Sequence, residues 1–191
     1  MSVSAKGIIE SVNENIVIAL RGTGDIVNVI VDNVSATVAS LVKDSGKTGE
    51  ALIESTQGIV SATIRGAVET GRNLEDGVKA LSIGILKGIS AAGQENLSSV
   101  SALAGSVIKA AGETGADIGV VTRGLIRGVI HTAKVAGVDA EKAAFAAAAG
   151  AVNAAYKISE EAGEKAGNAV VGTIDGIKVA LKESFDQIKK S

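Results

Sequence analysis

Two short features of the chain contain residue types that could take part in chemistry. Residues 45–48, Ser-Gly-Lys-Thr, resemble the end of a phosphate-binding loop, but that motif requires a glycine where this chain has Leu41. The chain has one histidine, His131, and no serine and acid accompany it in a catalytic pattern. We therefore interpret the first segment as a turn, and His131 as a variant of a repeated basic position.

The remaining candidates for site chemistry are carboxylates and metal ligands. Neighbouring acids such as Glu160 and Glu161 fall on a polar stripe and are typical of solvated charge. There is no cysteine, so a metal site would have to use His131 and carboxylates alone. We expect no catalytic, cofactor-binding or metal-binding residues and no enzymatic activity.

The dominant pattern that must organise these residues is a 22-residue repeat. In blocks counted from Val27, the first position of the next five blocks is glycine: Gly49, Gly71, Gly93, Gly115 and Gly137. Charges of alternating sign, which we call the charge ladder, recur every eleven residues at Glu10, Arg21, Asp32, Lys43, Glu54, Arg65, Asp76 and Lys87. The sequence therefore predicts about eight copies of one unit in a single repeat domain, residues 1–191.

The repeat length favours α-helix. Eleven residues make three turns at about 3.67 residues per turn, which is close to an undistorted helix and gives a straight or slightly right-handed supercoil. On this helix the ladder marks the centre of a polar stripe, and an apolar arc covers more than half of the circumference. The chain also contains no proline. A β-solenoid is the alternative for the β-branched residues 15–42, but it lacks alternation and would stack like charges.

We expect an all-α protein of long antiparallel helices that form a hairpin or bundle. Glycines beside N-cap candidates predict helix breaks near residues 47, 93 and 137, which would leave four helices of about 40 to 45 residues. One or two longer rods are the alternative, because the repeat keeps its phase across every turn. Glycines four residues apart, a spacing that allows close helix packing, occur at 84 and 88, 115 and 119, 124 and 128, 163 and 167, and 172 and 176.

Composition narrows the classes of partner. The net charge of -2, with both signs interspersed, provides no sustained positive field for nucleic acid. No charge-free stretch reaches the roughly 18 residues that suggest a membrane span. The N-terminal residues show no signal-peptide pattern, so we expect a cytoplasmic location.

The charge ladder admits two interpretations. Along one helix its charges are ~16 Å apart, beyond the Debye length of about 8 Å at physiological salt, so they do not pair within that helix. Either they set the register between copies of the protein, or they form a solvated face inherited by duplication.

The eleven- and 22-residue amphipathic periods, without proline and with few aromatics, resemble those of synucleins, exchangeable apolipoproteins, late-embryogenesis proteins and phasins. This resemblance of pattern spans nearly the whole chain and implies binding to a lipid or granule surface. In apolipoprotein helices, however, acidic residues occupy the centre of the polar face, whereas here both signs share it, which favours contact between helices. We therefore expect a non-enzymatic structural protein that self-associates into a filament, tube or layer. The alternative is an amphipathic coat of a membrane, lipid droplet or storage granule.

Overall fold

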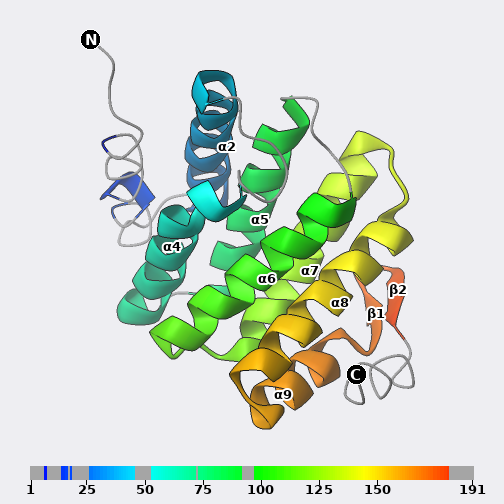
Figure 1. Ribbon diagram of the computed structural model, residues 1–191. Helices are drawn as coiled ribbons and strands as arrows, with labels where there is room; N and C mark the ends of the chain where they lie inside the picture. The colour runs from blue at the N-terminus through cyan, green and yellow to red at the C-terminus, as the bar shows by residue number, and fades with distance from the viewer. Residues whose placement is uncertain are drawn as a thin grey trace.

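Figure 1 shows the computed structural model, in which a stack of helices precedes a short hairpin. The structure describes residues 7, 14–16, 18, 26–45, 53–71, 73–91 and 97–180. Its main elements are α2 (Ile26–Ser45), α4 (Gln57–Thr70), α5 (Leu74–Ala91), α6 (Leu97–Thr114), α7 (Ile118–Ala136), α8 (Ala140–Ile158), α9 (Glu160–Val170), β1 (Gly172–Ile174) and β2 (Ile177–Ala180). The predicted all-α repeat fold is confirmed, apart from the hairpin.

The helices form two layers, in which each helix packs against the next helix but one along the chain. One layer contains α2, α5, α7 and α9, and the other contains α4, α6 and α8, which lie toward the viewer in Figure 1. Neighbours within a layer run parallel, since Gly84 and Gly88 of α5 contact Val34 and Val38 of α2 in the same order. Successive helices therefore alternate between layers, as in a helical solenoid.

The helices are shorter than predicted, at 11 to 20 residues. They end not only at Gly137, where a break was expected, but also at Gly71, Gly115 and Ser159. The φ angles are 61° at Gly71, 70° at Gly115 and 71° at Gly137, a left-handed conformation that glycine adopts without a steric penalty. The predicted breaks near 47 and 93 fall on residues outside those described. A helix therefore ends once per 22-residue unit, which corrects the prediction of four helices of twice that length.

A side-chain cap starts the next helix two residues after the glycine. Asp117 accepts a hydrogen bond of 2.9 Å from the backbone N–H of Val120, and Asp139 accepts one of 3.0 Å from that of Lys142. The units that begin at Gly115 and Gly137 thus contain both a stop and a start signal. The amphipathic pattern keeps its phase through the turn because the next unit presents the same face to the core. A continuous phase is therefore compatible with a helix that ends at the turn.

The wide apolar arc of each helix is buried within one chain. Ile64 of α4, Leu81 of α5 and Leu103 of α6 are all fully buried. A helix in the middle of a layer contacts a neighbour on either side as well as the opposite layer, and three contacting surfaces can cover more than half of its circumference. This burial stabilises helices that contain many glycines and would be weak in isolation.

Two of the predicted small-residue spacings give close helix contacts. A Cβ added at Gly84 would lie 2.8 Å from the Cβ of Val34, and one added at Gly128 would lie 2.8 Å from the carbonyl oxygen of Lys79. Gly88 and Gly124 meet α2 and α5 in the same way. At these four positions there is room for the hydrogen atom of glycine but not for a Cβ atom, which explains why glycine occurs inside these helices. At Gly167, by contrast, an added Cβ would meet nothing within 4 Å.

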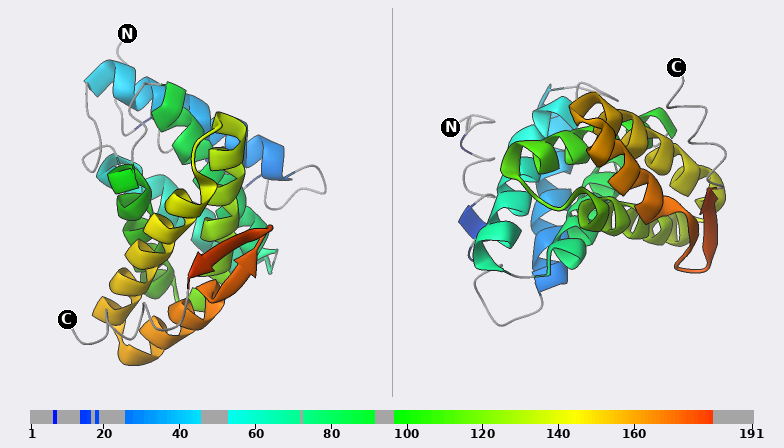
Figure 2. Two further views of the ribbon diagram at one scale, coloured as in Figure 1. Left: turned by 90° about the vertical axis from the view of Figure 1, so that its right-hand side faces the viewer. Right: turned by 90° about the horizontal axis from the view of Figure 1, so that it is seen from below.

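An antiparallel hairpin follows α9, where the sequence was expected to continue as helix. Ile174 pairs with Ile177, and the turn between them has φ of 46° at Asp175 and 81° at Gly176. Positive φ at both turn residues fits a type I′ turn, whose twist suits a two-residue hairpin. β2 packs against α8, and the right-hand view of Figure 2 shows the hairpin at one end of the helical stack.

Two basic side chains of α7 attach this hairpin to the stack. Arg127 lies 3.4 Å from the carboxylate of Asp175, and the Nζ of Lys134 donates a hydrogen bond of 2.7 Å to the backbone oxygen of the same residue. Arg127 also forms a 2.9 Å ion pair with Glu75 of α5. The hydrogen bond to Glu75 is the main cause that raises the pKa of Arg127 above its usual value. One arginine thus links α5, α7 and the hairpin.

Candidate functional site: an apolar pocket and groove at the start of α8

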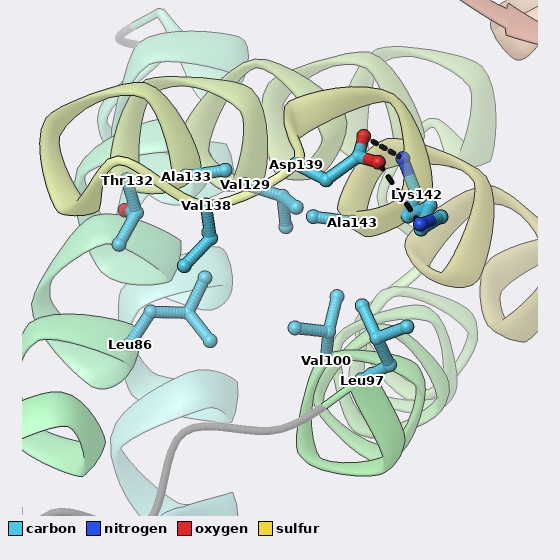
Figure 3. Close-up of a pocket in the computed structure, with 10 residues that line it drawn as sticks. All are labelled: Leu86, Leu97, Val100, Val129, Thr132, Ala133, Val138, Asp139, Lys142 and Ala143. Atoms are coloured by element: carbon cyan, nitrogen blue, oxygen red, sulfur yellow. Dashed lines mark hydrogen bonds and ion pairs between the residues drawn. The ribbon is translucent and has the colours of Figure 1, made fainter.

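One candidate site is a pocket where α5, α6, α7 and the start of α8 meet. It has a volume of about 230 Å³. Figure 3 shows its lining: Leu86, Leu97, Val100, Val129, Thr132, Ala133, Val138, Asp139, Lys142 and Ala143. We call it the α8 pocket. Val138 belongs to the turn that Gly137 and Asp139 create, so the signals that stop α7 and start α8 also place an apolar side chain at the pocket.

The polar groups of the α8 pocket are already engaged. Asp139 caps α8 and lies 3.3 Å from the Nζ of Lys142. The backbone hydrogen bond from Lys142 is the main cause that lowers the pKa of Asp139, so this carboxylate is charged near neutral pH. The hydroxyl of Thr132 donates to the carbonyl oxygen of Gly128 at 3.0 Å. The remaining lining is apolar, which suits an apolar side chain and offers no acid–base pair for catalysis.

A shallow groove continues from this pocket across the outer surface of α8 to β2. It is lined by Leu97, Glu141, Lys142, Phe145, Ala146, Lys178 and Val179, with a volume of about 410 Å³. Three large apolar side chains around the pocket and groove remain exposed: Leu97 at 49%, Val138 at 46% and Phe145 at 47%. We refer to the pocket and groove together as the α8 surface. Clustered exposed apolar side chains of this kind mark interaction sites.

The charge ladder does not form one line on the folded chain. Glu10 and Arg21 lie outside the described residues. The other six ladder residues lie in pairs along the chain. Asp32 and Lys43 are on α2, Glu54 is just before α4 with Arg65 on α4, and Asp76 and Lys87 are on α5. Because successive helices alternate between the layers, successive pairs lie on opposite sides of the molecule.

Most of the described ladder residues are exposed, and one of them has partners within the chain. Asp76 is partly buried, accepts a 2.8 Å hydrogen bond from the side-chain amide of Asn73, and lies 3.7 Å from Arg127. Asp32, Lys43, Glu54 and Arg65 form no ion pair with any other residue that the structure describes. Their part in setting register between copies stays a prediction.

The other residues singled out in the sequence lie apart from the α8 surface. His131 is exposed on α7, and Glu161 pairs with Lys165 at 2.8 Å in the first turns of α9. Of residues 45–48, only Ser45, the last residue of α2, is described. Within the described parts of the chain, no group of three histidine or acidic side chains could hold a metal ion, and no helix is both long and apolar enough to span a bilayer.

The α8 surface was not predicted from the sequence. Its residues come from the ends of α5, α6 and α7, from the start of α8 and from β2, and no periodicity links them. One local signal was present, because Val138 is a large apolar residue in a turn and Phe145 is a large one in the small-residue run 143–149. Their convergence depends on the path of the turns.

Comparisons with known proteins bear on the fold alone. No family model and no curated protein matches the chain. Among solved structures, the crystal structure of the de novo designed helical repeat protein DHR7 is similar, with a TM-score of 0.52 and 18% sequence identity, over 87% of this chain and 94% of that one. The likeness supports a helical repeat fold.

Proposed function

We propose that the protein is a non-enzymatic structural protein that self-associates, and that the α8 surface is one of its contacts. The observation that carries the proposal is the exposure of Leu97, Val138 and Phe145 around an apolar pocket. Burying large apolar side chains in such a pocket is the usual source of affinity at protein interfaces. A structural role is supported by the polar groups of the pocket, since Asp139 pairs with Lys142 and Thr132 donates to a backbone carbonyl oxygen.

A second copy of this chain is the partner that fits the charges. Asp139 and Glu141 are acidic and Lys142 and Lys178 are basic, and all four lie along the α8 surface. In a two-fold contact each surface meets its own copy in the opposite direction, so a surface with balanced charges can pair positive with negative groups. An apolar surface with charges of one sign would instead suit a partner of the opposite sign.

An elongated assembly requires a second contact besides a two-fold one. The outer surfaces of both layers supply candidates, because each carries exposed ladder charges of both signs, such as Asp32 and Lys43 on α2 and Glu54 and Arg65 in the other layer. Contacts of this kind set register more than affinity. Filaments, tubes or layers would arise from alternating α8 contacts with contacts between these charged surfaces.

The test is the substitution Phe145→Glu, measured by sedimentation velocity over a concentration series. A buried aromatic contact contributes about 2 kcal/mol or more at an interface, so we expect the dissociation constant of the assembly to rise by at least about ten-fold. Val120→Glu is the matched control, because Val120 is 36% exposed on α7, a helix that carries no ladder residue and no part of the exposed apolar cluster, and it receives the same charge. Circular dichroism should show equal helicity in both variants.

Two results would overturn the proposal. One is a wild-type protein that stays monomeric at every concentration. The other is equal weakening by Phe145→Glu and Val120→Glu, which would show that the added negative charge weakens association wherever it is placed. A monomer that binds lipid vesicles would favour the coat protein instead, although its apolar arcs would have to leave the core to reach the lipid.

A further inference from the structure

A second pocket lies among α2, α5 and α7 and shares Thr132 with the α8 pocket. Its volume is about 250 Å³. Lys79, Ile83 and Lys87 form one stripe along α5 at its centre, with α2 on one side and His131 of α7 on the other. Neighbouring helices of one layer thus enclose a hollow in its outer surface, as the concave surfaces of helical repeats do.

The charge of this pocket is uncompensated. Lys79, Lys87 and His131 all line it, and no acidic side chain does. Glu75 and Asp76, one turn before Lys79 on α5, are engaged by Arg127 at 2.9 and 3.7 Å. Within the described residues, none of the three basic side chains forms an ion pair, and neither does the exposed Asp32 on α2. The two lysines are therefore available to an anion from outside.

Apart from Asn28 and Thr132, the rest of the lining is apolar. Val31 and Ile83 are buried at the base of the pocket, Val27 is partly buried, and Val135 is 75% exposed at its edge. A simple inorganic anion would leave the exposed Val135 and the partly exposed Val27 in contact with water. A molecule with an acidic group and a short hydrocarbon body would satisfy both parts of the lining, because its acid would meet the lysines while its body covers the valines and isoleucine.

We propose that this pocket binds a small amphiphilic anion, a hydrocarbon chain that ends in a carboxylate or phosphate group. Lys79 and Lys87 hold the acidic group with help from His131, and Val31, Ile83 and Val135 contact the chain. The proposal is independent of self-association, because it concerns a ligand and not a second copy, and its residues other than Thr132 lie outside the α8 surface.

The test uses octanoate as the probe and two-dimensional NMR of the ¹⁵N-labelled full chain. We expect saturable shifts centred on the amides of Lys79, Ile83 and His131, weaker binding at high salt, and much weaker binding of inorganic phosphate and of octylammonium. The double substitution Lys79→Gln and Lys87→Gln should weaken octanoate binding roughly five-fold, because exposed ion pairs each contribute little. Hexyl phosphate and octanoate in parallel titrations distinguish the two acidic groups.

The matched control removes two other exposed lysines, Lys109→Gln on α6 and Lys157→Gln on α8. This variant has the same net charge as the double pocket variant, and it should bind octanoate as the wild type does. Shifts centred on Val138 and Ala143 would place the probe in the α8 pocket and overturn the proposal. So would equal affinity of octanoate and octylammonium, or equal effects of the two double variants.

Discussion

Glycine at the first position of the 22-residue unit ends a helix, whereas glycine inside a helix lies where two helices touch. Gly115 and Gly137 have positive φ, and no neighbouring atom would meet a Cβ added to either. Gly128, by contrast, is helical and lies against α5. Glycine is therefore needed for a left-handed backbone conformation at the helix ends and for close contact between helices inside them. A substitution is expected to act through backbone strain in the first case and through a steric clash in the second.

The first prediction compares two helical glycines. At Gly128 an added Cβ would lie 2.7 Å from the Cβ of Ser82 and 2.8 Å from a backbone oxygen of α5, so Gly128→Ala should lower the free energy of unfolding by about 1 to 3 kcal/mol. At Gly105 of α6 an added Cβ meets nothing within 4 Å, so Gly105→Ala should raise it by up to about 1 kcal/mol through helix propensity. Urea denaturation measures both. Equal effects at the two sites would refute the close packing of α5 and α7.

At the scale of elements, the hairpin takes the place at the end of the stack where another helix could pack. In the layer of α4, α6 and α8, each helix packs against the next, and β2 packs against α8. Val179 of β2 is 3% exposed and joins the core. A stack of repeats must cover its terminal apolar face, and at α8 the hairpin contributes that cover.

The second prediction concerns the ionic contacts of the hairpin. Arg127→Met removes the contacts to Asp175 at 3.4 Å and to Glu75 at 2.9 Å. These pairs are partly exposed, so we expect a loss of only about 1 kcal/mol in stability but a clear increase in amide exchange over 172–179, because the hairpin loses its attachment to α7. Hydrogen exchange with mass spectrometry measures this.

The control for the hairpin is Arg123→Met on the same helix. Arg123 is exposed and forms no ion pair with the described residues. It should leave exchange over 172–179 unchanged. Hairpin exchange that stays at the wild-type rate in Arg127→Met would mean that packing of β2 on α8 holds the hairpin without the arginine.

At the scale of the whole molecule, the two-layer packing changes what self-association must explain. Because the apolar arcs are buried within one chain, a partner is not needed to cover them. Association would instead depend on what stays exposed, namely the α8 surface and the ladder charges on the two layers. We therefore expect the apolar side chains of the α8 surface to supply the affinity of association and the ladder charges to set its register.

The third prediction tests the ladder with residues from both layers. Lys43→Glu with Arg65→Glu makes the charges on α2 and α4 acidic without touching the core, since both side chains are exposed. If the ladder sets register, assembly should weaken or change its stagger, and high salt should partly restore it through screening. A partner with Asp32→Lys and Glu54→Lys should assemble with this variant. Electron microscopy and light scattering measure both effects.

Arg123→Glu with Lys157→Glu is the control for the ladder. It changes net charge by the same amount at exposed positions outside the ladder. Assembly should then keep its wild-type geometry. If the ladder variant and this control behave alike, the ladder is a solvated face inherited by duplication.

The sequence by itself was sufficient for the helical repeat and for part of its packing. Period, the absence of proline and the width of the apolar arc are properties of neighbouring residues, so they could be evaluated without knowing the fold. The glycine spacings at Gly84 and Gly88 and at Gly124 and Gly128 indicated close contact for the same reason. The Asp139 cap after Gly137 was predicted from the sequence, whereas the equivalent Asp117 after Gly115 was equally visible and was missed.

Only the tertiary structure decided the length of the helices, the two layers, the hairpin and the α8 surface. An amphipathic phase that continues through a turn is the same for one long helix and for two short ones, so periodicity could not distinguish them. The hairpin depends on Asp175 and Gly176, a turn signal inside a repeat that otherwise predicted helix. Leu97, Val138 and Phe145 come together because α6 and α8 pack side by side in one layer and the turn between α7 and α8 lies at the same pocket, and no spacing along the chain encodes that convergence.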